Sequence, residues 1–167
     1  MTAYETMSFH LETERLILRP WSDADAAELR ALRAERGEGT DTLAYTRNLI
    51  AQLITATGTT GIALLPIQRR DEGDFIGYCG LIIGRSTLEE PEIAYELFRR
   101  VHGHGYATEA ARAVLDAAAA TGRQRIGATV DAANTASFRV LEKLGFARDR
   151  VTVEDKGEVV WLTRPLP

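Results

Sequence analysis

The sequence predicts one α+β domain over residues 1–167. Two observations lead to this fold class. Apolar strands and amphipathic helices follow the order strand, two helices, three strands, helix, strand, helix, two strands, which combines hairpins with one strand–helix–strand crossover. A doubly wound parallel sheet would instead alternate strands and helices throughout. Size agrees, since 167 residues, 45% of them hydrophobic, supply one core and would leave two domains undersized.

The first half of the chain predicts a strand, two helices and a hairpin. Pro20 ends the strand, Ser22 is a candidate helix cap, and Gly58 and Gly61 are expected to end the second helix. The expected elements are a strand at 16–18, a helix from Ser22 that Gly37 and Gly39 break, a helix at 42–57, and strands at 62–68 and 75–83. Residues 1–10 are polar and are expected to form a flexible tail.

The second half predicts short strands around two helices. The segment 92–98 alternates, so that residues 92, 94 and 96 face one side of a strand and residues 93, 95 and 97 the other. A clean apolar stripe predicts a helix at 106–121 that ends before Gly122. The remaining elements are a strand at 126–130, a helix at 134–144 with Asn134 as N-cap, and a hairpin of 151–153 with 159–162.

The composition favours a cytoplasmic protein and argues against nucleic-acid and membrane partners. A net charge of −4 gives no concentrated basic face for nucleic acid. The N-terminus has no signal-peptide pattern, and no stretch approaches the roughly 20 apolar residues that span a membrane. The single cysteine, Cys79, excludes an internal disulfide and is interpreted as a small buried hydrophobe. Of 20 basic residues only Lys143 and Lys156 are lysines, a bias associated with GC-rich bacterial genomes.

The most informative segment is the loop 100–105, Arg-Val-His-Gly-His-Gly, between a strand and a helix. A helix N-terminus presents unpaired N–H groups and partial positive charge, and Gly103 and Gly105 permit a tight turn without side chains in the way. Phosphate is the natural ligand of such a loop. Two other phosphate-binding motifs fit less well. The sequence has no Gly-Lys-Ser/Thr triplet at the helix start, which a P-loop requires, and it has Thr108 where a dinucleotide-binding loop has a third glycine. Spacing alone leaves a plain glycine-rich connection open.

This loop, followed by Tyr-Ala-Thr-Glu-Ala, resembles the acetyl-CoA loop of the GNAT superfamily. The resemblance covers nearly the whole chain. Residues 11–20, Leu-Glu-Thr-Glu-Arg-Leu-Ile-Leu-Arg-Pro, resemble the opening strand of the subgroup that contains the ribosomal-protein N-terminal acetyltransferases. The segments 75–78, 92–95, 134–137 and 142–146 resemble its third and fourth strands and its last helix.

The resemblance implies a sheet of about seven strands flanked by about four helices, with the fourth and fifth strands splayed apart. It also implies an acetyl-CoA-dependent N-acetyltransferase without a metal. The implied cofactor contacts are the backbone around Leu97 and Arg99, Arg100 and the loop, and the last helix. In full they are Leu97, Arg99, Arg100, Gly103, His104, Gly105, Tyr106, Ala107, Asn134 and Ser137.

Three residues are candidates for catalysis. Ser137 would donate to the leaving sulfur, and Glu92 or Glu96 would take the amine proton, with Glu92 preferred. Each has a plainer interpretation: Ser137 as a residue that only begins a helix, and the glutamates as strand residues that only face solvent. The sequence departs from the family at His104, where relatives have lysine, arginine or glutamine, and at Glu96, where an aromatic is usual.

The acceptor stays open among a protein N-terminus, a small amine such as a polyamine, and an aminoglycoside-like antibiotic. A non-catalytic acyl-CoA-binding sensor or interaction module on the same fold is the alternative function. A homodimer is an expectation drawn from the family alone.

Overall fold

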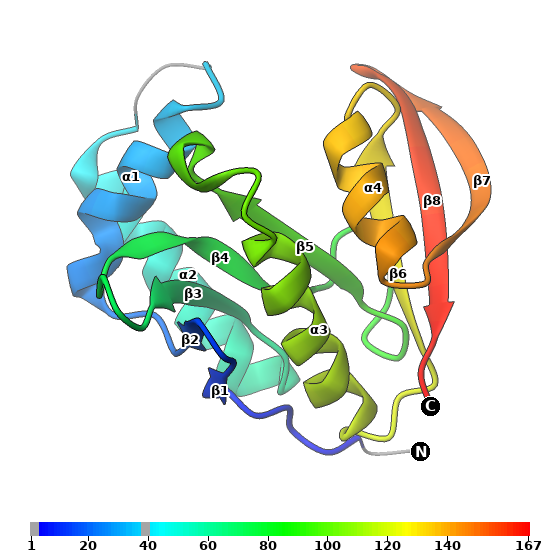
Figure 1. The fold of residues 1–167 in the computed structure, drawn as a ribbon, viewed down its shortest axis with the longest axis horizontal. Helices are drawn as coiled ribbons and strands as arrows, with labels where there is room; N and C mark the ends of the chain where they lie inside the picture. Colours follow the sequence, from blue (N-terminus) through cyan, green and yellow to red (C-terminus); the bar gives the residue numbers. More distant parts are fainter. Residues whose placement is uncertain (1–3, 38–40) are drawn as a thin grey trace.

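The computed structural model describes residues 4–37 and 41–167 and has one eight-stranded sheet flanked by helices (Figure 1). The strands run in the order β1-β2-β3-β4-β5-β6-β8-β7. Their bounds are β1 Leu11–Glu12, β2 Leu16–Leu18, β3 Leu64–Arg69, β4 Phe75–Ile82, β5 Glu92–Leu97, β6 Arg125–Asp131, β7 Ala147–Glu154 and β8 Gly157–Pro165. The helices are α1 Ala26–Ala34, α2 Leu43–Thr60, α3 Tyr106–Ala119 and α4 Thr135–Lys143, with short 3₁₀ turns at Asp23–Asp25 and Arg99–Val101.

All neighbouring strands are antiparallel except β5 and β6. These two run parallel and pair only at Glu92 and Gly127, after which they diverge. They correspond to the fourth and fifth strands of the sequence analysis. The predicted α+β fold with a splayed strand pair is therefore confirmed, and the splay opens the sheet at its centre.

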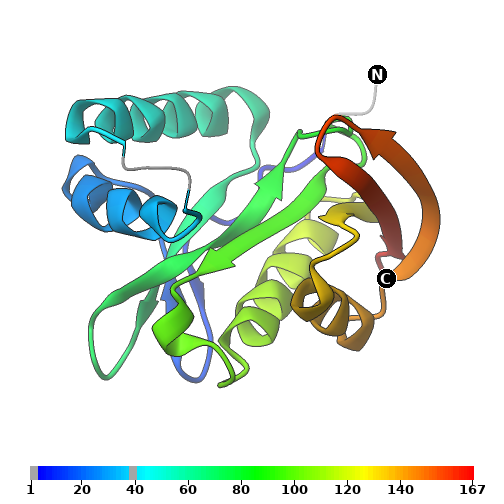
Figure 2. The same cartoon turned by 90° about the horizontal axis from the view of Figure 1, so that it is seen from above.

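Helices cover both faces of the sheet (Figure 2). α1 and α2 lie together on one face, and α3 and α4 lie on the other. The apolar stripe of α3 is buried, as the sequence predicted, at Ala110, Ala111, Val114, Leu115, Ala117 and Ala118. A single hydrophobic cluster joins these residues to the strands. Cys79 belongs to this core, and burial raises the pKa of its thiol, so it packs as a small hydrophobe.

The sheet has one strand more than expected because Leu11 and Glu12 pair with Leu18 and Ile17 as β1. The prediction that Gly58 helps to end α2 was wrong, since α2 continues through it to Thr60. Gly61 ends the helix, as expected, in a left-handed conformation with φ +74°. Gly39 lies outside the described residues.

The described part of the N-terminal segment packs against the body, unlike the flexible tail expected from its polarity. The N–H of Met7 donates to the carbonyl of Gly61, and that of Glu5 donates to the carbonyl of Thr121. The Met7 side chain is 2% exposed and belongs to the core. One buried methionine in a polar stretch is too weak a pattern to reveal this packing from sequence.

Candidate active site

A groove of about 560 Å³ lies where β5 and β6 diverge. Its walls come from the end of α1, from β5, from the loop that leads into α3, and from α4. The lining residues are Glu35, Arg36, Tyr95, Glu96, Leu97, Arg99, Val101, His102, Gly103, Gly105, Tyr106, Ala107, Thr108, Asn134, Ala136, Ser137, Arg139, Val140 and Lys143.

The start of α3 is an anion site built from main chain. Gly103 and Gly105 have φ of +82° and +79°, a left-handed conformation that glycine adopts without strain. Gly105 is the N-cap, and the first intrahelical bond runs from Glu109 N–H to its carbonyl. The N–H groups of Tyr106, Ala107 and Thr108 therefore have no acceptor within the helix and line the groove. This arrangement suits the pyrophosphate of a nucleotide.

The opposite wall is the first turn of α4. The side chain of Asn134 caps the helix, since its Oδ1 accepts from the N–H of Ser137 at 3.2 Å. This confirms Asn134 as the N-cap. The hydroxyl of Tyr95, on β5, donates to the main-chain carbonyl of Ser137 at 3.3 Å. Ser137 is thus held across the groove from β5 at a helix start, where the dipole favours negative charge.

The exposed edge of β5 supplies main-chain groups along the floor. The carbonyl of Pro91 accepts from Gly127 of β6, whereas the N–H of Phe98 donates to Ile76 of β4. Because neighbouring residues of a strand point their polar groups to opposite sides, Ile93, Tyr95 and Leu97 turn theirs toward the gap. The carbonyl of Leu97 accepts a hydrogen bond from Nε2 of His102 at 3.0 Å.

The other sheet face carries a cluster of charged side chains next to the groove. Nη2 of Arg36, just after α1, donates to Glu96 Oε1 at 2.7 Å and to the Tyr78 hydroxyl at 3.2 Å. The Tyr78 hydroxyl itself donates to Glu96 Oε1 at 3.1 Å. Burial, with the negative charge of Glu96, raises the pKa of Tyr78 to about 12, so Tyr78 remains a neutral donor. The hydrogen bond to Glu96 raises the pKa of Arg36.

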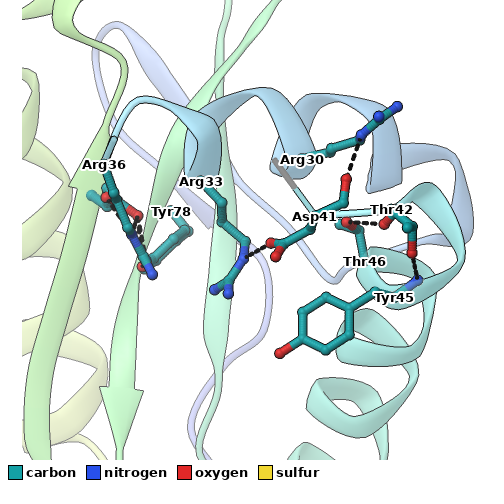
Figure 3. A network of polar contacts seen from close by, with 9 residues as sticks. Arg30, Arg33, Arg36, Asp41, Thr42, Tyr45, Thr46 and Tyr78 are labelled. Atoms are coloured by element: carbon teal, nitrogen blue, oxygen red, sulfur yellow. Dashed lines mark hydrogen bonds and ion pairs between the residues drawn. The ribbon is translucent and has the colours of Figure 1, made fainter. Parts of the chain in front are cut away.

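Two further contacts hold the end of α1 and the start of α2 beside this cluster (Figure 3). Arg30 Nε donates to the main-chain carbonyl of Asp41 at 2.7 Å, and Arg33 Nε donates to the Asp41 carboxylate at 2.5 Å. On the groove side, Glu35 Oε1 accepts from the N–H of Arg99 at 3.0 Å, and the Arg99 guanidinium donates to the Glu35 carbonyl. α1 is therefore fastened both to Asp41, just before α2, and to Arg99 in the groove wall.

The sequence profile of the acetyltransferase (GNAT) domain family matches residues 15–147. The chain belongs to this family. It is 34% identical over 149 residues to the uncharacterized protein YkkB of Bacillus subtilis, covering 81% of this chain and 83% of that protein. It is 33% identical over 150 residues to the uncharacterized N-acetyltransferase YoaA of the same organism, covering 84% of each.

A solved structure shows the same fold at low sequence identity. It is RimL, a ribosomal L7/L12 alpha-N-protein acetyltransferase in complex with coenzyme A. The two chains superpose with a TM-score of 0.83 at 15% identity, covering 94% of this chain and 98% of that one. The family match and the relationship to YoaA show that the chain is a GNAT acetyltransferase.

The GNAT groove brings together most of the residues that the sequence predicted. Those that line it are Glu96, Leu97, Arg99, Gly103, Gly105, Tyr106, Ala107, Asn134 and Ser137. The main-chain N–H of Arg99, expected to meet the cofactor, is instead taken by Glu35.

Three predicted residues do not line the groove. The Arg100 guanidinium turns to Asp74 Oδ2 and to the carbonyl of Phe75, at 2.9 and 3.1 Å. The carbonyl of His104 accepts from Arg15 at 2.9 Å. Glu92 lies at the start of β5 and is 3% exposed, and its carboxylate accepts from the Thr129 hydroxyl and the Arg85 N–H.

Sequence reasoning did not single out ten of the lining residues: Glu35, Arg36, Tyr95, Val101, His102, Thr108, Ala136, Arg139, Val140 and Lys143. Those on α4 follow helical spacing from Ser137, so a helical projection could have found Val140. Glu35 and Arg36 carry no such signal, because they reach the groove only through the packing of α1.

A second hollow, of about 620 Å³, lies by the β7–β8 turn. Arg85 and Glu154, which line it, pair with each other at 2.7 Å. Within residues 4–37 and 41–167, no group of three or more His, Cys, Asp or Glu residues is arranged to hold a metal ion. The helices of that same part are too short or too polar to cross a membrane.

Proposed function

We propose that this acetyltransferase moves the acetyl group of acetyl-CoA to a primary amine by direct attack in a ternary complex. One observation carries the proposal: a single groove joins the α3 anion site, the free edge of β5, Ser137 and Glu96. The anion site fits the pyrophosphate, and the β5 edge fits the amides of a pantetheine arm. Relatives of the same fold have been solved with coenzyme A or acetyl-CoA.

The reaction needs little more than orientation and two proton movements. The neutral amine attacks the thioester carbonyl carbon, a C–N bond forms, and the C–S bond breaks to release CoA thiolate. The amine loses one proton and the thiolate gains one. Ser137 is assigned as the donor to sulfur, because it sits in the first turn of α4 and lines the groove.

We assign the uptake of the amine proton to Glu96, directly or through a water. Glu92 was preferred from sequence, but Glu96 lines the groove and Glu92 does not. Both residues belong to the sheet face opposite that of Tyr95, because side chains alternate along β5. The Glu92 carboxylate already accepts hydrogen bonds from two other elements, which suits a residue that holds the fork between β5 and β6 closed.

The acceptor is proposed to be a protein N-terminus or a small-molecule amine. Arg36 already compensates the charge of Glu96, with Nη2 to Oε1 at 2.7 Å. We call the part of the groove around Arg36 and Glu96 the acceptor side. It therefore offers no uncompensated carboxylate at Glu96 for a strongly cationic substrate. This weakens the polyamine and aminoglycoside alternatives relative to peptide-like amines, which present one amine beside a neutral amide.

The test is release of free thiol from acetyl-CoA with a panel of amines, with the product confirmed by mass. The panel contains peptides with a free N-terminus, the same peptides with a blocked N-terminus, a polyamine and an aminoglycoside. Turnover with any free amine supports the proposed reaction, and turnover with free peptides but not with the polyamine or the aminoglycoside supports a peptide-like acceptor. Tight binding of acetyl-CoA without thiol release for any amine would support the sensor alternative. Light scattering of the purified chain tests the expected homodimer, and cell fractionation tests the cytoplasmic location.

A further inference from the structure

The turn between β1 and β2 lies beside the loop that begins α3. Arg15 lies in this turn, and its Nη2 donates to the carbonyl of His104 at 2.9 Å. Its guanidinium carbon stands 4.4 Å from the centre of the Tyr106 ring. Arg15 thus contacts the residue before Gly105 and the residue after it, from about 90 positions away in the sequence.

Glu109, in the first turn of α3, fixes Arg15 in this position. Its Oε1 accepts from Arg15 Nε at 2.7 Å, and its Oε2 accepts from the Arg15 N–H at 2.9 Å and from the Thr13 hydroxyl at 2.5 Å. Burial alone would raise the pKa of Glu109, but the hydrogen bonds from Thr13 and Arg15 outweigh it and lower that pKa. Glu109 is therefore a carboxylate at neutral pH, and Arg15 is held at two of its nitrogens.

These contacts decide which way the loop presents its polar groups. A peptide unit points its carbonyl and its N–H in opposite directions. Because Arg15 holds the carbonyl of His104, the N–H of Gly105 in the same peptide unit is turned away from Arg15.

We propose that Arg15, held by Glu109, is a positioning residue for the loop that binds the pyrophosphate of acetyl-CoA. The inference rests on the proposed function for the identity of the ligand. Arg15 keeps the amides of Gly105 and Tyr106 aimed at the anion before the cofactor arrives, so that binding does not have to order the loop. The Arg15 side chain is 43% exposed, so it contributes little to the core.

The turn does not need Arg15 to form. The N–H of Thr13 donates to the carbonyl of Leu16, and the N–H of Leu16 donates to the Thr13 hydroxyl at 3.0 Å. The N–H of Arg70 also bonds to the carbonyl of Arg15, a contact that any side chain at position 15 would keep. Arg15→Ala should therefore fold, which thermal unfolding will check.

The experiment compares two acetyl donors that differ in the pyrophosphate. Arg15→Ala is expected to raise the KM for acetyl-CoA about ten- to a hundredfold with kcat nearly unchanged, the effect of losing hydrogen bonds to a charged group. S-acetylpantetheine lacks the pyrophosphate, so its kcat/KM should not change. Glu109→Gln should also raise the KM for acetyl-CoA. Arg112→Ala, an exposed arginine on α3, is the matched control and should change neither donor.

Arg15→Lys separates positioning from simple attraction of the phosphates. Lysine keeps the charge but cannot hold Glu109 and the His104 carbonyl together, so it should behave like Arg15→Ala. Full rescue by lysine, or equal losses with both donors, would overturn the proposal. Calorimetry with CoA and with pantetheine gives the same comparison without turnover. If the wild-type chain transfers no acetyl group, a selective loss of CoA affinity would still support Arg15 and only the proposed function would fail.

Discussion

The two sides of the groove are built from different materials. On the donor side, the anion site consists of main-chain N–H groups at the start of α3, aimed by two glycines with positive φ. On the proposed acceptor side, the side chains of Arg36 and Glu96 line the groove, and the Tyr78 hydroxyl on β4 is hydrogen-bonded to both.

This difference separates what a family shares from what a member can vary. Main-chain geometry survives most substitutions, because only a residue that cannot adopt the backbone conformation disturbs it. A cluster of side chains changes with each substitution of its members. The donor side should therefore be sensitive to backbone changes and tolerant of side-chain changes, and the acceptor side the reverse.

The largest expected effect is that of Gly105→Val on the donor side. Valine is β-branched and cannot take φ +79° without strain, so the start of α3 must shift. We expect acetyl-CoA affinity to fall by about a hundredfold or more, which corresponds to strain of about 3 kcal/mol that the bound loop would have to bear. Isothermal calorimetry with acetyl-CoA measures it.

His104→Ala is the matched control, because it removes a side chain from the same loop and leaves the backbone free to keep its shape. Its affinity for acetyl-CoA should change by less than about threefold, the size of a surface substitution. Equal losses in the two variants would show that the imidazole, and not the amides, anchors the cofactor.

Ser137→Ala should have the next largest effect, on turnover rather than affinity. Removing one donor to the developing thiolate should lower kcat by roughly ten- to a thousandfold. Thiols have pKa values near 8.5, so the thiolate leaves without help at some rate, and the lower part of this range is expected. The main-chain contacts of Ser137 with Asn134 and Tyr95 persist in the variant. Unchanged kcat, or lost affinity at unchanged kcat, would contradict the assignment.

The loop and helix of the proposed donor side could be predicted from the sequence because their signals are local. Gly103, Gly105 and the apolar stripe of α3 lie within 20 residues, and the physics of a helix start connects them directly to an anion. The N-cap role of Asn134 was likewise predictable, because asparagine at the start of an expected helix accepts from a main-chain N–H of the first turn.

The acceptor side could not be predicted because its contacts are not local. Arg36 and Glu96 are 60 positions apart, and nothing in either segment indicates the other. The same limit explains Arg100, which was expected at the phosphates but turns to Asp74 in the preceding hairpin. Side-chain partners of this kind depend on how α1 and the β3–β4 turn pack, which periodicity does not reveal.

Glu96→Gln tests whether the acceptor side moves a proton. If Glu96 takes the amine proton, kcat should fall about tenfold or more, and the dependence of kcat/KM on pH should change while acetyl-CoA affinity stays. Glu92→Gln should leave the pH profile unchanged and lower thermal stability instead, because the amide nitrogen of glutamine cannot accept one of the two hydrogen bonds that Arg85 and Thr129 donate to the buried Glu92 side chain.

Arg36→Gln distinguishes a base from a clamp. It keeps Glu96 but removes its ionic partner, so with a base at Glu96 kcat/KM would still depend on pH, but along a curve displaced from that of the wild type. If Arg36→Gln and Glu96→Gln give the same loss of kcat with the same pH profile as the wild type, the pair only holds α1 in place. A changed profile in Glu92→Gln alone would return the role of base to Glu92.

The smallest expected effect concerns the arginines that flank the donor side without lining the groove. Asp74 accepts from Arg69 at 2.7 Å and from Arg100 at 2.9 Å. If the donor side is built on main chain, Asp74→Asn should lower the free energy of unfolding by less than about 1 kcal/mol at pH 7, since solvent screens this partly exposed cluster. Acetyl-CoA affinity should change by less than about twofold.

The pH dependence of that stability difference has a definite sign. The hydrogen bond from Arg69, with that from Arg100, lowers the pKa of Asp74 to about 2, against about 3.9 in an unfolded chain. A carboxyl group with a lowered pKa stabilises the fold fully above its unfolded pKa and loses that contribution as it is protonated in the native state. The gap between wild type and Asp74→Asn should therefore be constant from pH 7 to about 5 and narrow from about pH 4 toward pH 2. Urea unfolding at each pH measures it, with Glu72→Gln, the weaker partner of Arg69 at 3.2 Å, as the control that should show almost no gap. A gap that widens on acidification would mean that the Asp74 carboxylate form is favoured more in the unfolded chain than beside its arginines in the folded one.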